Sequence, residues 1–498
     1  MNALTESSFA PLHAPSASDV VKALLEILPA HCVLSRSEDT RPYECDGLSL
    51  YRSVPIAVVL PETELQVQRI LKTCKQLNVP VVARGAGTGL SGGAMPHAQG
   101  VLLGLAKFNR IRNIDHAAAI AVVEPGVRNL AVSEAVSQYG LYYAPDPSSQ
   151  IACTIGGNVA ENSGGVHCLK YGLTVHNVLK VRIVTMDGEI MELGSEAPDS
   201  PGPDLLSVFV GSEGMLGVVT EVTLRLTPKP ALAQVIMASF DDVEKASQAV
   251  AMIIGAGIIP AGLEMMDKQA TQMVEPFVKA GYDTTAEAIL LCESDGTIEE
   301  VADEIRRMED VFQRAGATRL QVSSSEAQRL LFWAGRKNAF PAAGRVSPDY
   351  YCMDGTIPRR RLGEVLKAIQ QMETTYSMRC ANVFHAGDGN LHPLILFDSN
   401  IADEVVRAEA FGAAILELCV EVGGTITGEH GVGMEKINQM CVQFERAELD
   451  MFLSVKRAFD PACLLNPEKV IPTLARCAEY GKMHVHGGAI AVPDLPRF

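Results

Sequence analysis

Two histidines flank a glycine-rich turn in the C-terminal half of the chain, and this feature restricts the local fold more than any other. Residues 383–394 read Val-Phe-His-Ala-Gly-Asp-Gly-Asn-Leu-His-Pro-Leu. Gly-Asp-Gly-Asn breaks helices and favours a tight turn, and the apolar residues on either side, 381–384 and 394–397, are typical of short strands. We therefore expect a β-hairpin that brings the imidazoles of His385 and His392 to one end of a sheet.

A second glycine-rich turn, Thr-Gly-Glu-His-Gly-Val-Gly, occupies residues 427–433. It holds Glu429 and His430 between glycines that let the backbone approach a ligand closely. A lone histidine is more often a hydrogen-bonded core or turn residue, but three of the eleven histidines fall in these two turns. Two imidazoles and a carboxylate are a common set for a divalent ion such as zinc, manganese or iron. We therefore expect His385, His392 and Glu429 to bind a divalent metal.

Length and charge narrow the class of protein. A chain of 498 residues is too long for one hydrophobic core, so two or three domains are expected. The net charge of −17 argues against nucleic acid as a partner, because phosphate binding needs clustered positive charge. We find no apolar run long enough to span a bilayer and no N-terminal pattern of a secretory signal, so a cytoplasmic location is expected.

The twelve cysteines are scattered along the chain. In a long chain without a secretory signal, reduced thiols are the default expectation. Because no two cysteines have the C-x-x-C spacing and no four are clustered, we do not expect this chain to bind an iron–sulfur cluster.

The first part of the chain is predicted to mix strands, turns and a few helices. An amphipathic helix is expected at 17–28. A strand at 56–60, a helix at 62–77 and a strand at 79–83 indicate a parallel unit. Thr-Pro-Lys-Pro at 227–230 then marks a boundary, because two prolines in three residues discourage both helix and sheet.

The pattern changes after this boundary. Strands at 234–240 and 288–293 alternate with amphipathic helices at 243–254 and 298–315, which predicts an antiparallel sheet with helices on one face. Helices at 403–421 and 446–459 are expected to close the chain.

The loop at 84–93 follows a predicted strand and contains a formal G-x-G-x-x-G at Gly87, Gly89 and Gly92. A nicotinamide Rossmann site needs a helix that begins within these glycines. We reject that site because Gly-Gly-Ala-Met-Pro at 92–96 cannot begin a stable helix. What remains is a loop with many free amide N–H groups, suited to wrapping a pyrophosphate.

Further turn-forming stretches follow in the same domain. Any one of them is explained by ordinary turns, but together with the first loop they favour a long cofactor held largely by main-chain groups. The stretches lie at 124–126, 146–149, 154–165 and 211–217.

These motifs resemble those of a known flavoprotein family. The loop at 84–93, Ile-Gly-Gly-Asn-Val-Ala-Glu-Asn-Ser-Gly-Gly at 155–165 and Gly-Ser-Glu-Gly-Met-Leu-Gly at 211–217 are similar to the FAD-binding domain of the vanillyl-alcohol-oxidase (PCMH) type. The hairpin, Gly-Glu-His-Gly at 428–431 and Leu-Leu-Asn-Pro-Glu-Lys at 464–469 resemble the C-terminal domain of FAD-linked D-2-hydroxy-acid dehydrogenases. The resemblance covers roughly residues 20 to 480.

The resemblance implies an α+β fold, in which a two-part FAD-binding domain precedes a C-terminal antiparallel-sheet substrate domain with helices on one face. The expected division is a tail and helix at 1–50, the FAD-binding domain at 51–228, the substrate- and metal-binding domain at 229–472 and a tail at 473–498. Some relatives attach FAD covalently through a histidine in the first glycine loop. The residue at that position is Thr88, which implies noncovalent FAD.

The resemblance also implies which residues contact FAD. Most come from the turns named above, and Asn466 either reaches the flavin from the second domain or caps a turn before Pro467. The expected FAD contacts are Arg84, Gly85, Ala86, Gly87, Thr88, Gly89, Leu90, Ser91, Pro145, Asp146, Ser149, Thr154, Gly156, Gly157, Asn158, Ala160, Asn162, Gly164, Gly165, Glu213, Gly214, Gly217, Val218, Val219 and Asn466.

The implied reaction is oxidation of a small 2-hydroxy acid, glycolate or D-lactate, with hydride transfer to FAD. The metal would bind the substrate hydroxyl and one carboxylate oxygen, and His430 would act as the base. Arg336, catalytic in this interpretation, would bind the substrate carboxylate rather than form a surface ion pair. Asp388 would either orient a metal-binding imidazole or satisfy its own turn.

Phe340 and Cys352 stand where relatives that act on dicarboxylic acids have polar or cationic groups, which favours a small monocarboxylate. The resemblance further implies two partner subunits, a second FAD-domain protein and an iron–sulfur protein, that pass electrons to quinone at the inner face of the membrane. A self-sufficient FAD-linked D-lactate dehydrogenase and a non-catalytic flavin-binding scaffold remain alternatives. A zinc hydrolase would share the metal ligands but would not need the glycine-rich stretches.

Overall fold

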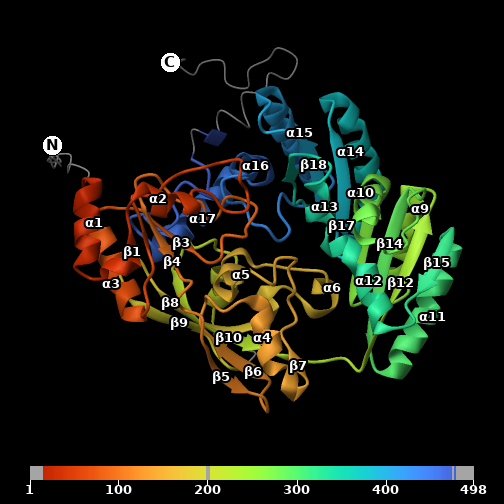
Figure 1. The fold of residues 1–498 in the computed structure, drawn as a ribbon, viewed down its shortest axis with the longest axis horizontal. Helices are drawn as coiled ribbons and strands as arrows, with labels where there is room; N and C mark the ends of the chain where they lie inside the picture. The colour runs from red at the N-terminus through yellow and green to blue at the C-terminus, as the bar shows by residue number, and fades with distance from the viewer. Residues whose placement is uncertain (1–14, 198–201, 474–475, 478–498) are drawn as a thin grey trace, which may run out of the picture.

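The computed structural model describes residues 15–197, 202–473 and 476–477. It contains two bodies side by side (Figure 1). One, coloured red to yellow, comes from the first part of the chain, and the other, green to cyan, surrounds a large sheet. The fold is the expected α+β type, with one mixed sheet and several antiparallel ones.

The first sheet has the strand order β1-β2-β4-β3. Strands β2 and β3 both pair in parallel with β4, as the predicted strand–helix–strand unit requires. Residues 85–100, between β3 and β4, form turns and no helix, which agrees with the rejection of a Rossmann site. The elements are β1 (Val33–Leu34), β2 (Ala57–Val59), β3 (Val81–Arg84), β4 (Val101–Gly104), α1 (Ala17–Leu25), α2 (Ser37–Thr40) and α3 (Glu64–Gln76).

Capping residues explain where the two longer helices of this part begin. Ser16 and Asp19 form a reciprocal capping box at the start of α1, and Thr63 and Gln66 do the same for α3. Each box satisfies amide groups that have no partner within the helix.

The second sheet is antiparallel, with the order β5-β6-β10-β8-β9, and a two-stranded ribbon pairs β7 with β11. The first sheet, the second sheet and the connecting turns make up the FAD-binding part that the sequence predicts. The strands are β5 (Ile111–Asp115), β6 (Ile120–Val123), β7 (Leu141–Tyr142), β8 (Val178–Val184), β9 (Ile190–Gly194), β10 (Val218–Arg225) and β11 (Thr227–Pro228). The helices are α4 (Asn129–Val136), α5 (Ile155–Glu161), α6 (Cys168–Tyr171), α7 (Thr174–Asn177) and α8 (Leu205–Phe209).

The other body is a seven-stranded antiparallel sheet with the order β15-β12-β14-β13-β17-β18-β16. Its strands are β12 (Leu232–Phe240), β13 (Gly262–Asp267), β14 (Ala288–Gly296), β15 (Arg319–Val322), β16 (Asp349–Cys352), β17 (Arg379–His385) and β18 (Asn390–Phe397). Its helices are α9 (Val243–Gly255), α10 (Lys268–Val278), α11 (Ile298–Arg314), α12 (Glu326–Lys337), α13 (Ala339–Ala343), α14 (Leu362–Tyr376) and α15 (Ala402–Glu421).

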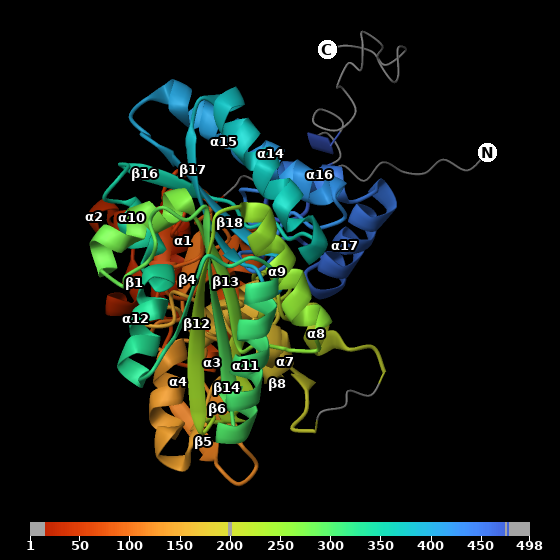
Figure 2. The ribbon, with the colours of Figure 1, turned by 90° about the vertical axis from the view of Figure 1, so that its right-hand side faces the viewer.

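Helices cover both faces of this sheet, whereas the sequence analysis expected them on one face. The expected layer is present, because α9, α11, α14 and α15 share one core with the sheet. A second core forms on the opposite face from α10, α12 and α13, and Figure 2 shows α11 and α12 on opposite sides of β12 and β14. Consecutive strand residues point to opposite faces, and Ile236 and Met237 are both buried, one in each core. The sheet is therefore apolar on both faces.

The last described part of the chain returns to the FAD-binding part (blue in Figure 1). It begins with α16 (Ile437–Gln443), which still packs in the core of the second body, and continues with α17 (Arg446–Phe459), whose Val455 and Phe459 pack against the core of the second sheet. Leu464 and Leu465 pack into the core of the first sheet, and Val81 forms a β-bridge with Leu465. The predicted division at residue 228 assigns Leu464 and Leu465 to the C-terminal domain, although they pack against the first sheet.

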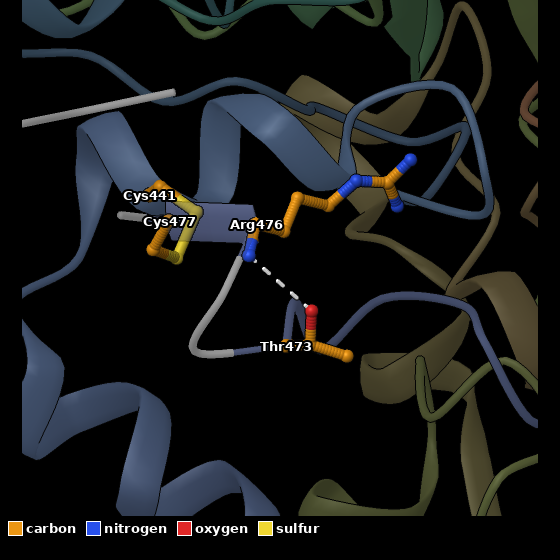
Figure 3. The surroundings of a disulfide bond; sticks show 4 residues. All are labelled: Cys441, Thr473, Arg476 and Cys477. Atoms are coloured by element: carbon orange, nitrogen blue, oxygen red, sulfur yellow. Dashed lines mark hydrogen bonds between the residues drawn. A yellow bond between two sulfur atoms is a disulfide. The ribbon is translucent and has the colours of Figure 1, made fainter. Parts of the chain in front are cut away.

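One pair of cysteines departs from the expectation of reduced thiols. Cys441 of α16 and Cys477 form a disulfide across a Cα–Cα distance of 5.3 Å (Figure 3). The amide of Cys477 also donates to the carbonyl of Thr473. The two cysteines are 36 residues apart in sequence, so spacing alone does not reveal the pairing.

None of the helices in the described ranges combines the length and the apolar character that crossing a membrane requires.

Candidate active site

The predicted hairpin is present, and its turn is built as the sequence indicates. Strands β17 and β18 pair from Arg379 opposite Leu396 to His385 opposite Asn390. Gly389 has φ +87°, and a Cβ there would lie 2.2 Å from the carbonyl oxygen of Ile357, so only glycine fits. The Oδ1 of Asp388 accepts from the amide of Asn390 at 3.1 Å, which is the turn contact that the sequence analysis considered for this residue.

The three residues expected to bind a metal come together. His385 Nε2 and His392 Nε2 lie 3.2 Å and 3.4 Å from the same oxygen, Oε1 of Glu429. One ligand atom from each residue lies within 4.8 Å of the other two. Neither ring nitrogen of His392 has a hydrogen-bond partner although both are buried, which costs free energy unless a ligand is bound. These residues therefore fit a divalent cation.

The protonation states of Glu429 and His392 suit a cation, whereas Glu264 outweighs burial and raises the pKa of His385, so that imidazole must release a proton to bind one. Burial raises the pKa of Glu429, but the neighbouring His385, His392 and His430 more than offset this and lower it to about 2. Burial lowers the pKa of His392 to about 4, so its imidazole is neutral near pH 7. An ionised carboxylate and a neutral imidazole are the forms that bind metals.

His430, the expected base, lies beside this cluster. Its ring stacks on that of His392, with centroids 4.8 Å apart and an interplanar angle of 8°. Its Nε2 is 4.0 Å from Glu429 Oε1, and its buried Nδ1 has no hydrogen-bond partner. Burial lowers the pKa of His430 below its ordinary value, so a neutral ring is available to take a proton.

Arg336 is buried in α12, with 1% of its side chain exposed, and does not form a surface ion pair. Its Nε donates to Glu264 Oε2 at 2.5 Å, and the other oxygen of Glu264 lies 2.7 Å from His385 Nδ1. Burial raises the pKa of Glu264, but His385 and Arg336 more than offset it and lower that pKa. Glu264 was not among the predicted site residues. In the sequence it stands out only as an acidic residue inside the apolar strand β13.

A cavity of about 380 Å³ runs between the glycine-rich turns and the end of the hairpin. Its wall joins the FAD-binding part to the imidazoles of the other body. Seventeen of the predicted FAD contacts line it: Arg84, Gly85, Ala86, Gly87, Thr88, Gly89, Leu90, Ser149, Thr154, Gly156, Gly157, Asn158, Ala160, Glu213, Gly214, Gly217 and Val219. At its other end lie Lys337, Phe340, Pro341, Tyr350, His392, Glu429 and His430.

The loop at residues 84–93 packs closely against the turn at Thr154, and glycine makes this possible. A Cβ on Gly85 would lie 2.3 Å from Thr154 Oγ1, so a side chain at this position would push apart two turns that both line the cavity. Arg84 holds the loop from behind, because its Nη1 donates to the carbonyls of Cys45 and Ala94. The resulting narrow space with free amides suits the pyrophosphate of a dinucleotide.

Eight predicted FAD contacts are not among the residues that line the cavity, and for all twenty-five residues contact with FAD stays a prediction. The amide of Asn466, for example, donates to the carbonyls of Gly93 and Glu213, two residues of the wall, while its oxygen accepts from Lys469. The Oγ of Ser91 donates to the carbonyl of His430. The eight are Ser91, Pro145, Asp146, Asn162, Gly164, Gly165, Val218 and Asn466.

An ionic network that sequence analysis missed joins the two bodies close to this cavity. His167, which precedes α6, has Nδ1 2.8 Å from Asp146 and Nε2 3.2 Å from Glu293 of β14. Glu293 also accepts from Arg329 and from the indole N–H of Trp333. Burial lowers the pKa of His167, but the two carboxylates outweigh it and raise it to about 10. His167 is therefore a cation between the two bodies.

Sequence comparison identifies the family. Residues 55–194 match the FAD binding domain, and residues 229–470 match the FAD linked oxidases, C-terminal domain. The chain is 61% identical over 481 residues, 97% of its own length and 96% of the relative's, to the glycolate oxidase subunit GlcD of Escherichia coli K12. The chain belongs to the FAD-linked oxidases.

Other relatives of this FAD-linked oxidase carry related names. The glycolate oxidase subunit GlcD of Bacillus subtilis is 39% identical over 435 residues, covering 87% of this chain and 93% of the relative. A D-lactate dehydrogenase of Anaerostipes hadrus is 31% identical over 467 residues, covering 91% and 97%.

Solved structures agree on the fold of this FAD-linked oxidase. p-Cresol methylhydroxylase with bound substrate matches with a TM-score of 0.75 at 18% identity, over 91% of this chain and 96% of that one. Alkyldihydroxyacetonephosphate synthase matches with a TM-score of 0.74 at 18% identity, over 94% and 89%. At this level of identity, the two structures show the fold alone.

Proposed function

We propose that this FAD-linked oxidase converts a small 2-hydroxy acid, glycolate in the first place, to the 2-oxo acid. The main support for the proposal is that residues of the glycine-rich turns and residues of the histidine cluster line the same cavity. Glycine-rich turns of an FAD-binding domain form one end, and His392, Glu429 and His430 form the other. The 61% identity to a glycolate oxidase subunit supports the choice of substrate.

Each group has a defined task in this proposal. FAD, when bound, would supply the acceptor for the C2 hydrogen as a hydride, and His385, His392 and Glu429 would hold a divalent ion that would lower the pKa of the substrate hydroxyl. His430 takes the hydroxyl proton on Nε2, the ring nitrogen 4.0 Å from Glu429 Oε1. Stacking on His392 holds its ring in place.

Arg336 is proposed to bind the substrate carboxylate. Its Nε is engaged by Glu264 and its Nη2 lies 3.3 Å from His385 Nε2, so Nη1 is the atom left for substrate. The same contacts tie the carboxylate site to the metal site, because Glu264 bonds both Arg336 and His385. A shift of the arginine would therefore move a metal ligand as well.

The cavity favours a small substrate at this end. Phe340 and Tyr350 line it with their rings 5.6 Å apart, and they offer apolar surface rather than a second cationic group. A dicarboxylic acid would place its second carboxylate against these rings and would depend on Lys337, which lines the same end, for a partner.

Flavin spectroscopy of the purified protein tests the proposal. We expect the visible bands of bound FAD to bleach when glycolate is added without oxygen. A panel of 2-hydroxy acids and metal analysis of the same sample then rank substrates and identify the ion. If FAD is present but no 2-hydroxy acid reduces it, the chain is a flavin-binding scaffold and the proposal is wrong.

A second candidate is a self-sufficient D-lactate dehydrogenase, which the 31% identity to the Anaerostipes hadrus enzyme favours. We propose instead that the chain works as a subunit, since two of its relatives are named as subunits. Its proposed partners are a second FAD-domain protein and an iron–sulfur protein, with the assembly at the inner face of the cell membrane.

A further inference from the structure

One carboxylate outside the expected metal site organises the loop that carries Glu429 and His430. Asp354 follows β16 and is 0% exposed. Its two oxygens accept from the amides of Gly428, Glu429 and His430 at 3.0, 3.1 and 2.9 Å. The hydroxyl of Thr427 donates to it at 2.6 Å. Four consecutive residues of the loop are thus held by one side chain.

Asp354 also connects this loop to the hairpin. The side-chain amide of Asn390, the residue opposite His385 in the hairpin, donates to Asp354 Oδ1 at 2.8 Å. The backbone supports the same arrangement, because the amide of Gly428 also donates to the carbonyl of Asp354. The two segments that supply the metal ligands therefore meet at one carboxylate.

A buried lysine balances the charge. Lys436 is 0% exposed, and its Nζ lies 3.0 Å from Asp354 Oδ2. The same ammonium donates to the carbonyl of Gly431 at 2.9 Å. A buried pair of this kind is stable only with good geometry and further hydrogen bonds, and removing one partner leaves an uncompensated charge.

Two overlapping sets of residues have the spacing of a metal site, and they share His392. One contains His385 and Glu429, and the other contains Asp354 and His430. An ionised carboxylate has about four lone-pair sites, and Asp354 already receives donors from Thr427, Gly428, Glu429, His430, Asn390 and Lys436. In the hydrogen bonds and ion pairs of the described residues, the side-chain carboxylate of Glu429 contacts only the imidazoles of His385, His392 and His430, so its oxygens are available.

We infer that Asp354, neutralised by Lys436, is the positioning residue of the metal centre and not one of its ligands. The inference rests on the proposed function, and it goes further by choosing between the two sets. Because one carboxylate orients both a ligand and the base, its loss should weaken metal binding and leave FAD binding unchanged.

Cobalt binding to the purified FAD-loaded chain tests this inference without relying on turnover. Asp354→Asn removes the charge and presents an amide to several donors. Asp267→Asn is the matched control, since Asp267 is also a buried acid of this body, bonded to the amide of Ala270 and the side chain of Asn382. We expect Asp354→Asn to keep FAD, to bind Co²⁺ at least about tenfold more weakly, and to show unchanged Co²⁺ absorption bands at saturation. The control should match the unchanged chain.

Several outcomes would overturn the inference. Unchanged Co²⁺ affinity in Asp354→Asn would remove the positioning role, and shifted Co²⁺ bands at saturation would make Asp354 a ligand. If Asp354→Asn does not fold, Lys436→Gln keeps the carboxylate and should still weaken Co²⁺ binding; full affinity in that variant would contradict us. If His392→Ala binds Co²⁺ as tightly as the unchanged chain, the metal site of the proposed function falls, and this inference with it.

Discussion

At the scale of residues, the environments of three neighbouring histidines separate their roles. The pKa of His385 is raised well above its ordinary value, because Glu264 outweighs the effect of burial. Burial lowers the pKa of both His392 and His430. The same kind of side chain is thus held protonated against Glu264 in one case and neutral near pH 7 in the two others, within one cluster.

Replacing a metal ligand separates the metal site from the flavin site. We expect His392→Ala to retain FAD, to lose bound metal and to lower kcat by at least about a hundredfold, since a metal contributes several kcal/mol to such a reaction. Flavin absorbance, metal analysis and steady-state rates measure the three effects. His116→Ala, at an exposed histidine stacked on Tyr139, is the control. Full activity in His392→Ala, or after exhaustive chelation, would exclude the metal.

The proposed role of Arg336 in substrate binding is tested by a change that keeps its charge. Lysine cannot form the two-pronged contacts of a guanidinium, and at position 336 its single nitrogen would have to serve both Glu264 and the substrate carboxylate. We expect Arg336→Lys to lower kcat/KM at least tenfold, about 1.4 kcal/mol of transition-state stabilisation, with a raised KM. Arg345→Lys, nearby but stacked on Phe277, is the control. Normal steady-state kinetics would show that Arg336 does not bind substrate.

At the scale of elements, the segment around α6 fastens the FAD-binding part to β14 of the large sheet. His167 contributes one ionic contact, and Lys170 contributes another to Asp295 at 2.5 Å. The hydroxyl of Tyr171 donates to the same Asp295. A short helix of low intrinsic stability is therefore held by charged contacts with the other body.

These contacts predict how stability depends on pH. The pKa of His167 is about 10 in the folded chain and near 6.5 when unfolded. The folded state therefore binds an extra proton between these values, and the contribution is complete below pH 6.5 and lost as pH rises towards 10. We expect stability to fall by up to about 1.4 kcal/mol per pH unit between about pH 7 and 9.

Urea unfolding midpoints of the unchanged chain and of His167→Gln, measured across this pH range, check the prediction. The variant should lack this part of the decline and be less stable at pH 7. His116→Gln, at an exposed histidine stacked on Tyr139, should behave like the unchanged chain. Parallel pH curves for His167→Gln and the unchanged chain would mean that His167 is not a cation held between the two bodies.

At the scale of the whole molecule, the two bodies meet around the cavity, and residues from both line it. The chain also returns from the second body to the first, where Asn466 and Lys469 bond the loop at Gly93. Hydride transfer inside this cavity leaves electrons on the flavin, which must be reoxidised before the next turnover.

The proposed partners are tested by comparing assemblies. The chain alone should bleach its flavin with glycolate but reduce quinone at no more than about a hundredth of the rate of the co-expressed assembly, because the missing carriers leave no fast route for electrons. Quinone reduction and oxygen uptake, measured with and without the two partners, provide the comparison. Equal rates would make the chain self-sufficient, as the alternative D-lactate dehydrogenase would be.

The sequence by itself determined the local parts of this protein. The hairpin at 383–397, the turn at 427–433 and the parallel unit around α3 follow from glycine placement, β-branched runs and helix periodicity. These signals act between neighbouring residues. The family resemblance then added the FAD-binding role of turns that each have an ordinary structural explanation.

The tertiary structure alone decided which buried groups meet. Arg336 and Glu264 are 72 residues apart in sequence, and His385 and Glu264 are 121 apart. No local period relates such residues, because their contact depends on which strands become neighbours in the seven-stranded sheet. Helices on both faces of that sheet and the Cys441–Cys477 disulfide have the same origin. Burial then makes each pairing obligatory, since an unpaired charge in the interior costs several kcal/mol.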